Sequence, residues 1–284
     1  IPAICGSQGN NCVKVTVYGL GIIGASVCAS LKRAGHFVLG MNRSRRPIEY
    51  ALEHGYIDGE AKSFDGVEVV VLALPPRICA GVLEEGAFPS GCIVSDICGV
   101  KTELERTVFS APRRYRYVGI HPMAGKETSG IESACADLFD GKNLVMIRTN
   151  ETDQEAFVTM ERLGRDMGFS RIVVCSAAEH DRMIALTSQL AHVVSNAYVK
   201  SPLTGGCVGF TGGSFQDMTR IAGVDENVWT ELFHINRACL IPEIERLCAR
   251  LEEYKSALEN DDEEQTKRLL SEGKRAFAQF EENK

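Results

Sequence analysis

VKVTVYGLGIIGAS, residues 13–26, joins a β-branched run to closely spaced glycines and is the strongest indication of the fold. Residues 13–18 predict a first strand, and residues 25–34, which stop before Gly35, predict a helix. In that setting Gly19 permits a tight turn, Gly21 lets the backbone approach a pyrophosphate, and Gly24 lets the helix pack closely on the strand. An ordinary glycine turn is the alternative, but the flanking strand and helix favour a dinucleotide-binding unit. The predicted cofactor loop comprises Gly19, Leu20, Gly21, Ile22, Ile23 and Gly24.

Strands and helices alternate through the first half of the chain. Residues 37–41 predict the second strand and residues 48–54 the second helix. Further apolar runs predict strands at residues 67–74, 93–96, 117–120, 143–148 and 171–174, with a helix beginning after Asn150. Near-continuous apolar strands separated by helices are typical of a doubly wound α/β domain with a mostly parallel sheet, the Rossmann fold.

The pattern becomes all-α after Ser176. Helical spacing is found at residues 177–200, 217–222, 227–248, 251–259 and 264–280. Apolar residues surround most of the helix at residues 177–200, which predicts that this helix is buried. We therefore predict a Rossmann dinucleotide-binding domain over residues 1–175 and an all-helical domain over residues 176–284.

Composition narrows the class of protein. The chain has 284 residues, of which 44% are hydrophobic and 24% charged, with a net charge of −7. These values are typical of a globular protein and argue against a nucleic-acid or membrane partner. No apolar run approaches the roughly 20 residues that span a bilayer, and residues 1–11 lack a signal-peptide pattern, so we expect a cytoplasmic location. The chain has 11 cysteines and no CxxC pair, which indicates reduced thiols and no metal site.

Residues after the second predicted strand bear on the choice of cofactor. NAD sites usually carry an acid there for the ribose hydroxyls, whereas this chain has Asn42, Arg43 and Ser44. Arg43 and Ser44 suit a 2′-phosphate, so we expect NADP to be favoured over NAD, unless the stretch is only a solvated basic loop. Leu74 and Pro75 follow a strand at the carboxyl edge of the sheet, where we expect them to line the nicotinamide crevice.

A histidine stands at a second strand end. His121 directly follows the strand predicted at residues 117–120, so its imidazole is expected beside the reactive end of the cofactor. An imidazole there suits a hydrogen-bond acceptor or general base near neutral pH. From position alone, a structural histidine is an equal alternative.

The helical half offers polar candidates in apolar surroundings. Asp181, Ser188 and His192 fall on one narrow stripe of the helix at residues 177–200. Polar groups on a buried helix need partners, so the stripe indicates either ligand contacts or an internal hydrogen-bond network. Arg220 lies between apolar neighbours and is expected to bind a carboxylate, from a ligand or from Asp217.

Four stretches together resemble the prephenate/arogenate dehydrogenase family of tyrosine biosynthesis. They are GLGIIGAS at residues 19–26, HPMAGKETSG at 121–130, HDRMIALTSQLAH at 180–192 and GGSFQDMTRIA at 212–222, with Trp229 beyond. They occur in the family's order, which makes the resemblance far more specific than the glycine motif alone. The resemblance implies a Rossmann domain followed by a helical substrate and dimerisation domain, and hence a homodimer.

The same resemblance implies an activity and roles for residues. Members oxidise and decarboxylate prephenate to 4-hydroxyphenylpyruvate, or arogenate to tyrosine, with NAD or NADP. The positions that match the family's motifs make His121 the catalytic group that accepts a hydrogen bond from the ring hydroxyl, and Arg220 the partner of a substrate carboxylate. Ser188 and His192 match residues that contact or shape the substrate site. The chain departs from the pattern at Gly99, where many members carry a serine that contacts the histidine or the substrate.

Several alternatives remain at this point. Arogenate differs from prephenate only by an amine in place of a keto group, and the sequence does not decide between them. A β-hydroxyacid dehydrogenase is more remote, since it normally uses a helix lysine where this chain offers Ser188 and His192. A non-catalytic NADP-sensing protein would bind cofactor without turnover. Gln189 and Ala191 replace a histidine and a proline of many members, which leaves the shape of the substrate end open.

Overall fold

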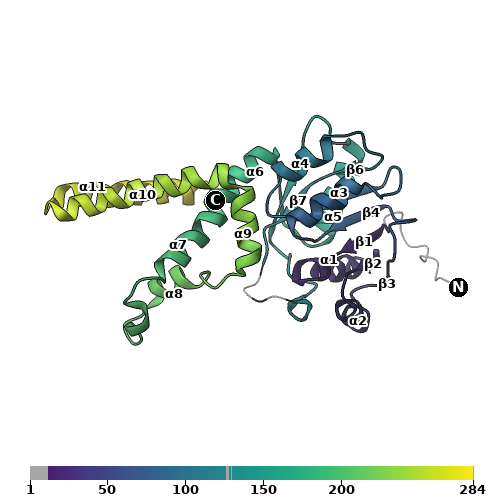
Figure 1. Ribbon diagram of the computed structural model, residues 1–284, viewed down its shortest axis with the longest axis horizontal. Coiled ribbons are helices and arrows are strands. Elements are labelled where there is room, and N and C mark those ends of the chain that lie inside the picture. Colours follow the sequence, from purple (N-terminus) through teal and green to yellow (C-terminus); the bar gives the residue numbers. More distant parts are fainter. Residues whose placement is uncertain (1–11, 126–127, 129, 284) are drawn as a thin grey trace.

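The computed structural model describes residues 12–125, 128 and 130–283. They form two parts, an α/β domain and a helical domain whose first helix begins after Ser176 (Figure 1). The side chain of Ser176 caps that helix by accepting a hydrogen bond from the amide of Glu179. The last strand, β9, ends at Cys175, directly before this cap.

The α/β domain is built on a parallel sheet in the order β3-β2-β1-β4-β5-β6. Its strands are β1 (Lys14–Tyr18), β2 (Phe37–Met41), β3 (Gly59–Glu60), β4 (Val69–Leu72), β5 (Ile93–Asp96) and β6 (Arg116–Tyr117). The helices between them are α1 (Ile22–Arg33), α2 (Arg45–Glu53), α3 (Pro76–Glu85) and α4 (Thr102–Phe109). The strand order reverses between β1 and β4, and a ligand crevice is expected at the carboxyl ends of those two strands. The Rossmann fold is thereby confirmed.

The core lies on both faces of this sheet. All four residues of β4 are buried, and they alternate between two apolar clusters. Val69 and Val71 belong to the cluster that includes α1, whereas Val70 and Leu72 belong to the cluster that includes α3 and α4. This alternation follows from the period of two in a strand, and it explains why the strand reads as a continuous apolar run.

The strand predicted at residues 117–120 is wrong as a single element. β6 ends at Tyr117, and β7 (Ile120–Pro122) begins a second sheet in the order β7-β8-β9, with β8 at Asn143–Ile147 and β9 at Arg171–Cys175. The chain crosses between the sheets at Val118 and Gly119, which bond to Val94 and Ile147 respectively. Gly119 is suited to the crossing because a Cβ there would lie 3.1 Å from the Tyr117 hydroxyl.

His121 therefore lies within β7, which runs antiparallel to β8, and does not follow a strand of the Rossmann sheet. Its backbone pairs with that of Val145. α5 (Gln154–Asp166) connects β8 to the parallel β9, and a short 3₁₀ turn at Ile131–Ser133 precedes β8. The expectation of a histidine at a Rossmann strand end is thus corrected, because the chain changes sheets before it reaches His121.

The helical domain follows the predicted order with different boundaries. Its helices are α6 (Ala177–Ile184), α7 (Ala191–Tyr198), α8 (Gly213–Thr219), α9 (Glu226–Ile235), α10 (Arg237–Glu259) and α11 (Glu263–Glu282). A π-helical segment, Ala185–Leu190, joins α6 to α7, and a 3₁₀ turn occupies Thr204–Gly206. The predicted helix at residues 227–248 instead breaks at Asn236, and α10 continues through the predicted break near residue 250. Asn236 is buried and its side chain is held by two hydrogen bonds, which favours the break there.

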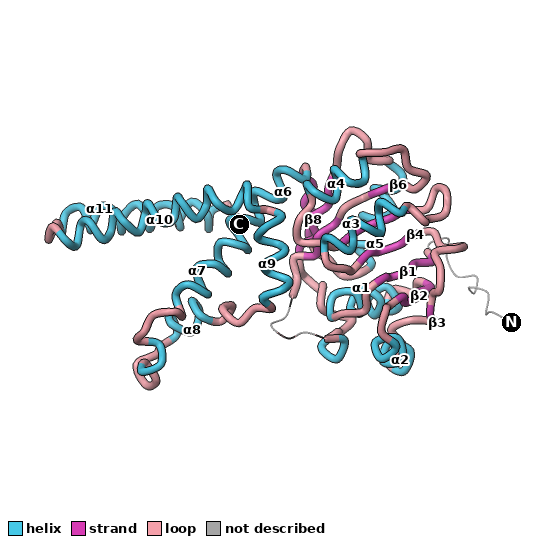
Figure 2. The backbone as a smooth tube through the Cα atoms, in the orientation of Figure 1, coloured by secondary structure: helices cyan, strands magenta, loops and turns pink. Residues whose placement is uncertain are grey.

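The helical domain leaves apolar side chains uncovered. α10 and α11 pack side by side as a hairpin that projects away from the Rossmann domain (Figure 2). Met183 and Leu186, on the helix predicted to be buried, are 54% and 50% exposed, so that prediction is wrong for a single chain. Among the described residues, no helix is both long and apolar enough to cross a membrane.

Candidate active site

The glycine loop packs as a cofactor loop requires. Gly19 has a φ of +102°, and a Cβ there would lie 2.2 Å from the carbonyl oxygen of Ala73. A Cβ on Gly24 would lie 1.9 Å from the carbonyl oxygen of Gly19. Gly21 has open space, and the first turn of α1 after it carries neither an acidic residue nor a side-chain cap. The positive end of α1 is therefore left for a phosphate.

The end of β2 braces this loop. The side-chain oxygen of Asn42 accepts a hydrogen bond from the amide of Leu20 at 3.0 Å, and its nitrogen donates to the carbonyl of Ser44 at 3.2 Å. The side chain that replaces the usual acid is thus engaged with the backbone on both sides. Ile22 and Ile23 lie in the first turn of α1 and are half-buried.

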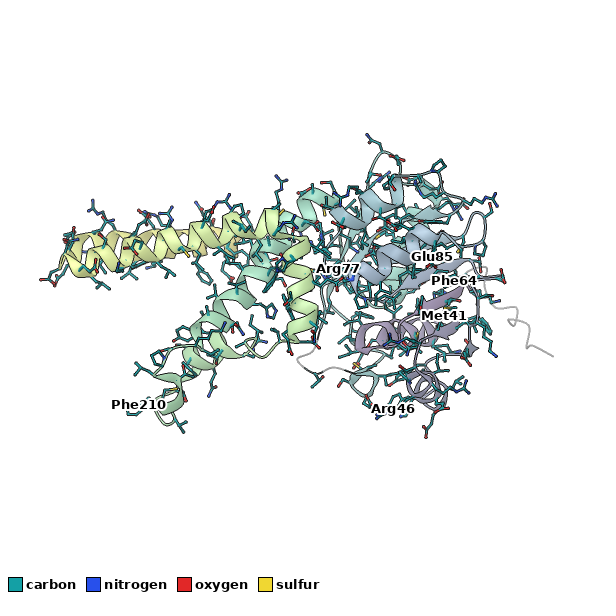
Figure 3. The ribbon with its side chains drawn as sticks, viewed as in Figure 1. Met41, Arg46, Phe64, Arg77, Glu85 and Phe210 are labelled. Carbon is teal, nitrogen blue, oxygen red and sulfur yellow. The ribbon has the colours of Figure 1, made fainter. Side chains whose placement is uncertain are left out.

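The basic residues after β2 divide into two kinds. Arg45 is paired with Glu49 and Glu60, and Arg46, labelled in Figure 3 near α2, is paired with Glu132. Arg43 is exposed and makes no ion pair within the described part of the chain. Ser44 is the N-cap of α2 but its side chain makes no capping bond. Arg43 and Ser44 are therefore the groups that remain for an anion at this position.

Leu74 and Pro75 form the loop that faces the glycine loop. Leu74 is half-buried, and its Cδ2 lies 3.1 Å from the position of a Cβ on Gly19, so the two loops touch. Pro75 is the N-cap of α3, and the carbonyl of Leu74 accepts a hydrogen bond from the thiol of Cys98. The structure thus brings the glycine loop and the predicted crevice loop together.

His121 is linked to a pair that sequence reasoning did not single out as a unit. Its Nδ1 lies 2.8 Å from Nε2 of His180, and Nδ1 of His180 lies 2.7 Å from Oδ1 of Asp181. The Asp181 carboxylate also accepts hydrogen bonds from the amides of Lys101 at 2.8 Å and Thr102 at 2.9 Å. His180 and Asp181 lie in α6, so the chain of contacts crosses from one domain to the other.

This chain of contacts fixes the tautomer of His121. A carboxylate only accepts hydrogen bonds, so His180 carries its proton on Nδ1 and its neutral ring offers Nε2 as an acceptor. His121 must then donate from Nδ1, which leaves the lone pair of its Nε2 free to act as a base. A Cβ on Gly99 would lie 3.7 Å from that Nε2 atom, which puts Gly99 on the wall of the site.

The electrostatic surroundings keep His121 neutral. Burial, then the neighbouring His180 and the charge of Lys101, hold the pKa of His121 well below its usual value. Burial also lowers the pKa of His180. The pKa of Asp181 is lowered, because its hydrogen bonds outweigh the opposing effect of burial. A neutral imidazole, linked through His180 to the ionised carboxylate of Asp181, is in the protonation state that a general base needs.

A buried ion pair supports the wall beneath His121. The Lys101 ammonium lies 2.5 Å from Oδ1 of Asp96, and the Tyr117 hydroxyl donates to Oδ2 of the same carboxylate at 2.5 Å. Asp96, Cys98 and Cys79 also form the group of possible metal-ligand atoms that the described residues contain. Asp96 is already satisfied by a cation and a hydroxyl, so its chemistry is that of a structural ion pair.

The predicted polar stripe meets two different sets of partners. Asp181 belongs to the contacts with His180 and α4, which is the internal network that the sequence left open as an alternative. His192 donates from Nδ1 to the carbonyl of Ile221 at 3.0 Å, and its ring packs 3.7 Å from that of Trp229. Ser188, in the π-helical segment, is half-buried.

Arg220 and α9 complete the second half of the site. Arg220 is exposed, and its charge contributes to a lowered pKa of His192, for which burial is the main cause. α9 carries Trp229 against His192 and, one turn later, Leu232, whose Cδ2 lies 3.7 Å from the Cβ position of Gly99. The two halves, His121 with Gly99 and His192 with Arg220, are therefore bridged by one helix.

Sequence reasoning missed three buried positions. It did not identify His180 as the partner of His121, although the adjacent His180 and Asp181 at the start of a helix were a usable signal. Gln189 and Asn236 form a buried amide pair at 2.8 Å, and the Gln189 side chain also reaches the carbonyl of Leu232. Gln189 lies in the π-helical segment, which the helical spacing of residues 177–200 did not indicate.

Comparisons with known proteins identify the family of both domains. A family profile described as prephenate dehydrogenase, nucleotide-binding domain matches residues 27–173, and one described as prephenate dehydrogenase, dimerization domain matches residues 176–272. A prephenate dehydrogenase from Bacillus subtilis is 28% identical over 269 residues, which cover 88% of this chain and 71% of that protein.

Two solved structures are similar over nearly the whole chain. Prephenate dehydrogenase from A. aeolicus in complex with hydroxyphenyl propionate and NAD+ has a TM-score of 0.83 and 26% identity, covering 97% of this chain and 100% of that one. Synechocystis arogenate dehydrogenase has a TM-score of 0.79 and 25% identity, covering 94% and 99%.

Proposed function

The chain belongs to the prephenate dehydrogenase family, and on that premise we propose that it oxidises and decarboxylates prephenate to 4-hydroxyphenylpyruvate with a nicotinamide cofactor. The observation that carries the proposal is the free Nε2 lone pair of a neutral His121, which the contacts with His180 and Asp181 create. A proton acceptor of this kind suits the oxidation of an alcohol.

The cofactor site fits a dinucleotide on two observations. Space is open at Gly21, and the uncapped first turn of α1 offers backbone amides to a pyrophosphate. Leu74 and Pro75 would hold the nicotinamide end. A nicotinamide bound there would supply the hydride acceptor for the ring carbon that bears the substrate hydroxyl.

The protein's own side chains then accept the proton of the substrate hydroxyl and bind a substrate carboxylate. Nε2 of His121 accepts the proton of the hydroxyl as carbonyl character develops on the ring. The resulting imidazolium is stabilised through its Nδ1–H bond to His180, whose own Nδ1–H is held by Asp181. Arg220 binds a substrate carboxylate, and Ser188 and His192 orient the substrate from the helical side. Loss of carbon dioxide makes the ring aromatic, which drives the reaction forward.

The test is the appearance of reduced nicotinamide with prephenate and with arogenate, each offered with NAD and NADP. Turnover of prephenate that is lost in His121→Asn supports the proposal, because asparagine keeps a polar side chain but cannot act as a base. Turnover of neither substrate, despite cofactor binding, overturns it. That result would favour a β-hydroxyacid dehydrogenase or a non-catalytic NADP-sensing protein.

Arogenate is the second candidate substrate. The specific observation in its favour is the similarity to the Synechocystis arogenate dehydrogenase. Both substrates present the same ring hydroxyl to His121, so the same mechanism serves either. Turnover of arogenate alone would keep the chemistry and change the substrate.

NADP is proposed as the favoured nicotinamide cofactor over NAD. The support is local: Asn42 is engaged with the backbone, and Arg43 and Ser44 are exposed beside it at the start of α2. A guanidinium, a hydroxyl and a helix N-terminus together suit a 2′-phosphate. Comparable use of the two cofactors in steady-state kinetics would reject this preference.

The homodimer is likewise a proposal. The profile matched by residues 176–272 describes a dimerization domain, and Met183 and Leu186 are exposed on α6 and the π-helical segment. A second copy would cover such apolar side chains. Light scattering that gives only the monomer mass would refute it.

A further inference from the structure

A second contact between the domains lies beside the crevice. Oε1 of Glu231, in α9, accepts a hydrogen bond from the backbone amide of Arg77 at 2.6 Å, although 154 residues separate them. Figure 3 shows Arg77 at the end of α3 that faces α9. Glu231 is half-buried at this junction.

The contact supplies a cap that α3 lacks. Its N-cap is Pro75, which makes no side-chain cap; its next residue, Pro76, has no N–H, and its first turn holds no acidic residue. The amide of Arg77 is therefore an orphan donor at the positive end of a helix, and a carboxylate is the group it best accommodates. Here the carboxylate comes from the other domain.

The same device occurs at α4. The amide of its N-cap residue, Lys101, and that of its first residue, Thr102, donate to the carboxylate of Asp181 in α6. The helical domain thus places one carboxylate on the N-terminus of α3 and another on that of α4. Asp181 also bonds to His180, whereas the Glu231 carboxylate bonds to the backbone of α3.

Glu231 lies on α9, the helix that contacts both halves of the candidate site. The next residue, Leu232, touches the wall formed by Gly99, and Trp229, in the same helix, packs on His192. Fixing α9 against α3 therefore fixes the separation between the His121 half of the site and the His192 half. A substrate that must reach both halves depends on that separation, whereas a cofactor held by the glycine loop does not.

We propose that Glu231 is a positioning residue that clasps the two domains and sets the substrate site without contributing to the cofactor site. The inference rests on the proposed function for its kinetic readout. Loss of the clasp lets α9 shift relative to α3, so substrate KM rises by about tenfold, the effect of one charge-assisted hydrogen bond. The Kd of the reduced cofactor, measured by its fluorescence without substrate, stays within about twofold of wild type.

The experiment compares Glu231→Ala and Glu231→Gln with Glu226→Gln, an exposed glutamate in the first turn of the same helix. Glu231→Ala should raise substrate KM and leave the pH profile of kcat/KM unchanged, because the contacts of His121 remain. Glu231→Gln keeps a neutral acceptor without the charge and should give a substrate KM between those of wild type and Glu231→Ala. Glu226→Gln should match wild type. An unchanged KM in Glu231→Ala, or a cofactor Kd that weakens in parallel, would overturn the proposal.

Hydrogen exchange gives a readout independent of activity. The Arg77 amide should be protected in wild type and exchange rapidly in Glu231→Ala, with the rest of α3 little changed. If wild type turns over neither substrate, the proposed function fails while this measurement still tests the clasp. Equal hydrogen-exchange rates of the Arg77 amide in wild type and Glu231→Ala would refute the clasp, whatever activity is measured.

Discussion

Nδ1 of His121 lies 2.8 Å from Nε2 of His180, although 59 residues and a domain boundary separate the two. The orientation of the candidate base is therefore set by a residue of the helical domain. Since Asp181 accepts the Nδ1 proton of His180, all three groups are locked into one pattern of donors and acceptors. The catalytic competence of the Rossmann domain thus depends on the docking of α6.

Removing the partner of His121 should impair turnover more than binding. In His180→Phe the Nδ1 atom of His121 loses its acceptor, so the reactive tautomer is no longer enforced. We expect kcat to fall on the order of 10²-fold, within the range of general-base effects, while substrate KM changes little. Steady-state kinetics with prephenate check this. An unaltered kcat in a folded His180→Phe variant would show that the tautomer is set by other groups.

The rate should stay constant across neutral pH. Burial, His180 and Lys101 hold the pKa of His121 well below 6.5, and only the neutral imidazole acts as a base. Because the pKa is lowered, kcat/KM should persist as pH falls through 6.5 and decline only at lower pH. The profile of initial rates against pH measures this directly. A decline centred above pH 6.5 would mean that another group controls the reaction or that His121 is solvated.

Position 99, where many family members carry serine, should accept the substitution Gly99→Ser. A Cβ there would lie 3.6 Å from Cε1 and 3.7 Å from Nε2 of His121, which is ordinary contact. Gly99→Ser therefore fits and adds one hydrogen bond near the base, for an increase of up to about tenfold in kcat/KM. Gly99→Ala, which adds the Cβ without the hydroxyl, is the matched control. Equal effects of the two substitutions would mean that the hydroxyl finds no partner.

The fold could be predicted largely because its signals are local. Gly19 and Gly24 are required because a Cβ would lie 2.2 Å from the carbonyl oxygen of Ala73 in the first case and 1.9 Å from that of Gly19 in the second, and both glycines belong to one six-residue motif. The buried strands β4 and β5 read as continuous apolar runs since both of their faces are covered. The glycine motif and the continuous apolar runs can therefore be recognised from the sequence alone.

The features that could not be predicted depend on contacts between residues far apart in the sequence. The change of sheet after Tyr117 is decided by pairing with β8, which no periodicity in residues 117–122 encodes. The π-helical segment exists together with the buried pair Gln189 and Asn236, 47 residues apart. The clasp of Glu231 on α3 spans 154 residues. Each of these three features could be identified only from the tertiary structure.

Arg43 should discriminate between the two cofactors. If its guanidinium binds the 2′-phosphate, Arg43→Ala raises the KM for NADP by about tenfold or more, the effect of a charge-assisted contact, and leaves the KM for NAD nearly unchanged. Arg45→Ala is the control, because Arg45 is already paired with Glu49 and Glu60. Parallel changes for both cofactors in Arg43→Ala would assign Arg43 to the solvated loop that the sequence allowed.

The break between α9 and α10 should be the weak point of the helical domain. The Asn236 side-chain nitrogen donates at 2.8 Å both to the carbonyl of Asp181 and to Oε1 of Gln189, and the residue is buried. Asn236→Asp replaces that donor with an acceptor facing two acceptors, so we expect a loss of about 3 kcal/mol in the stability of the helical domain. Urea unfolding followed by the fluorescence of Trp229 measures it, with the exposed Asn227→Asp as control. Because Asp181 lies in this network, kcat should fall with stability, and a stable, fully active Asn236→Asp variant would show that the amide pair does not hold α6 in place.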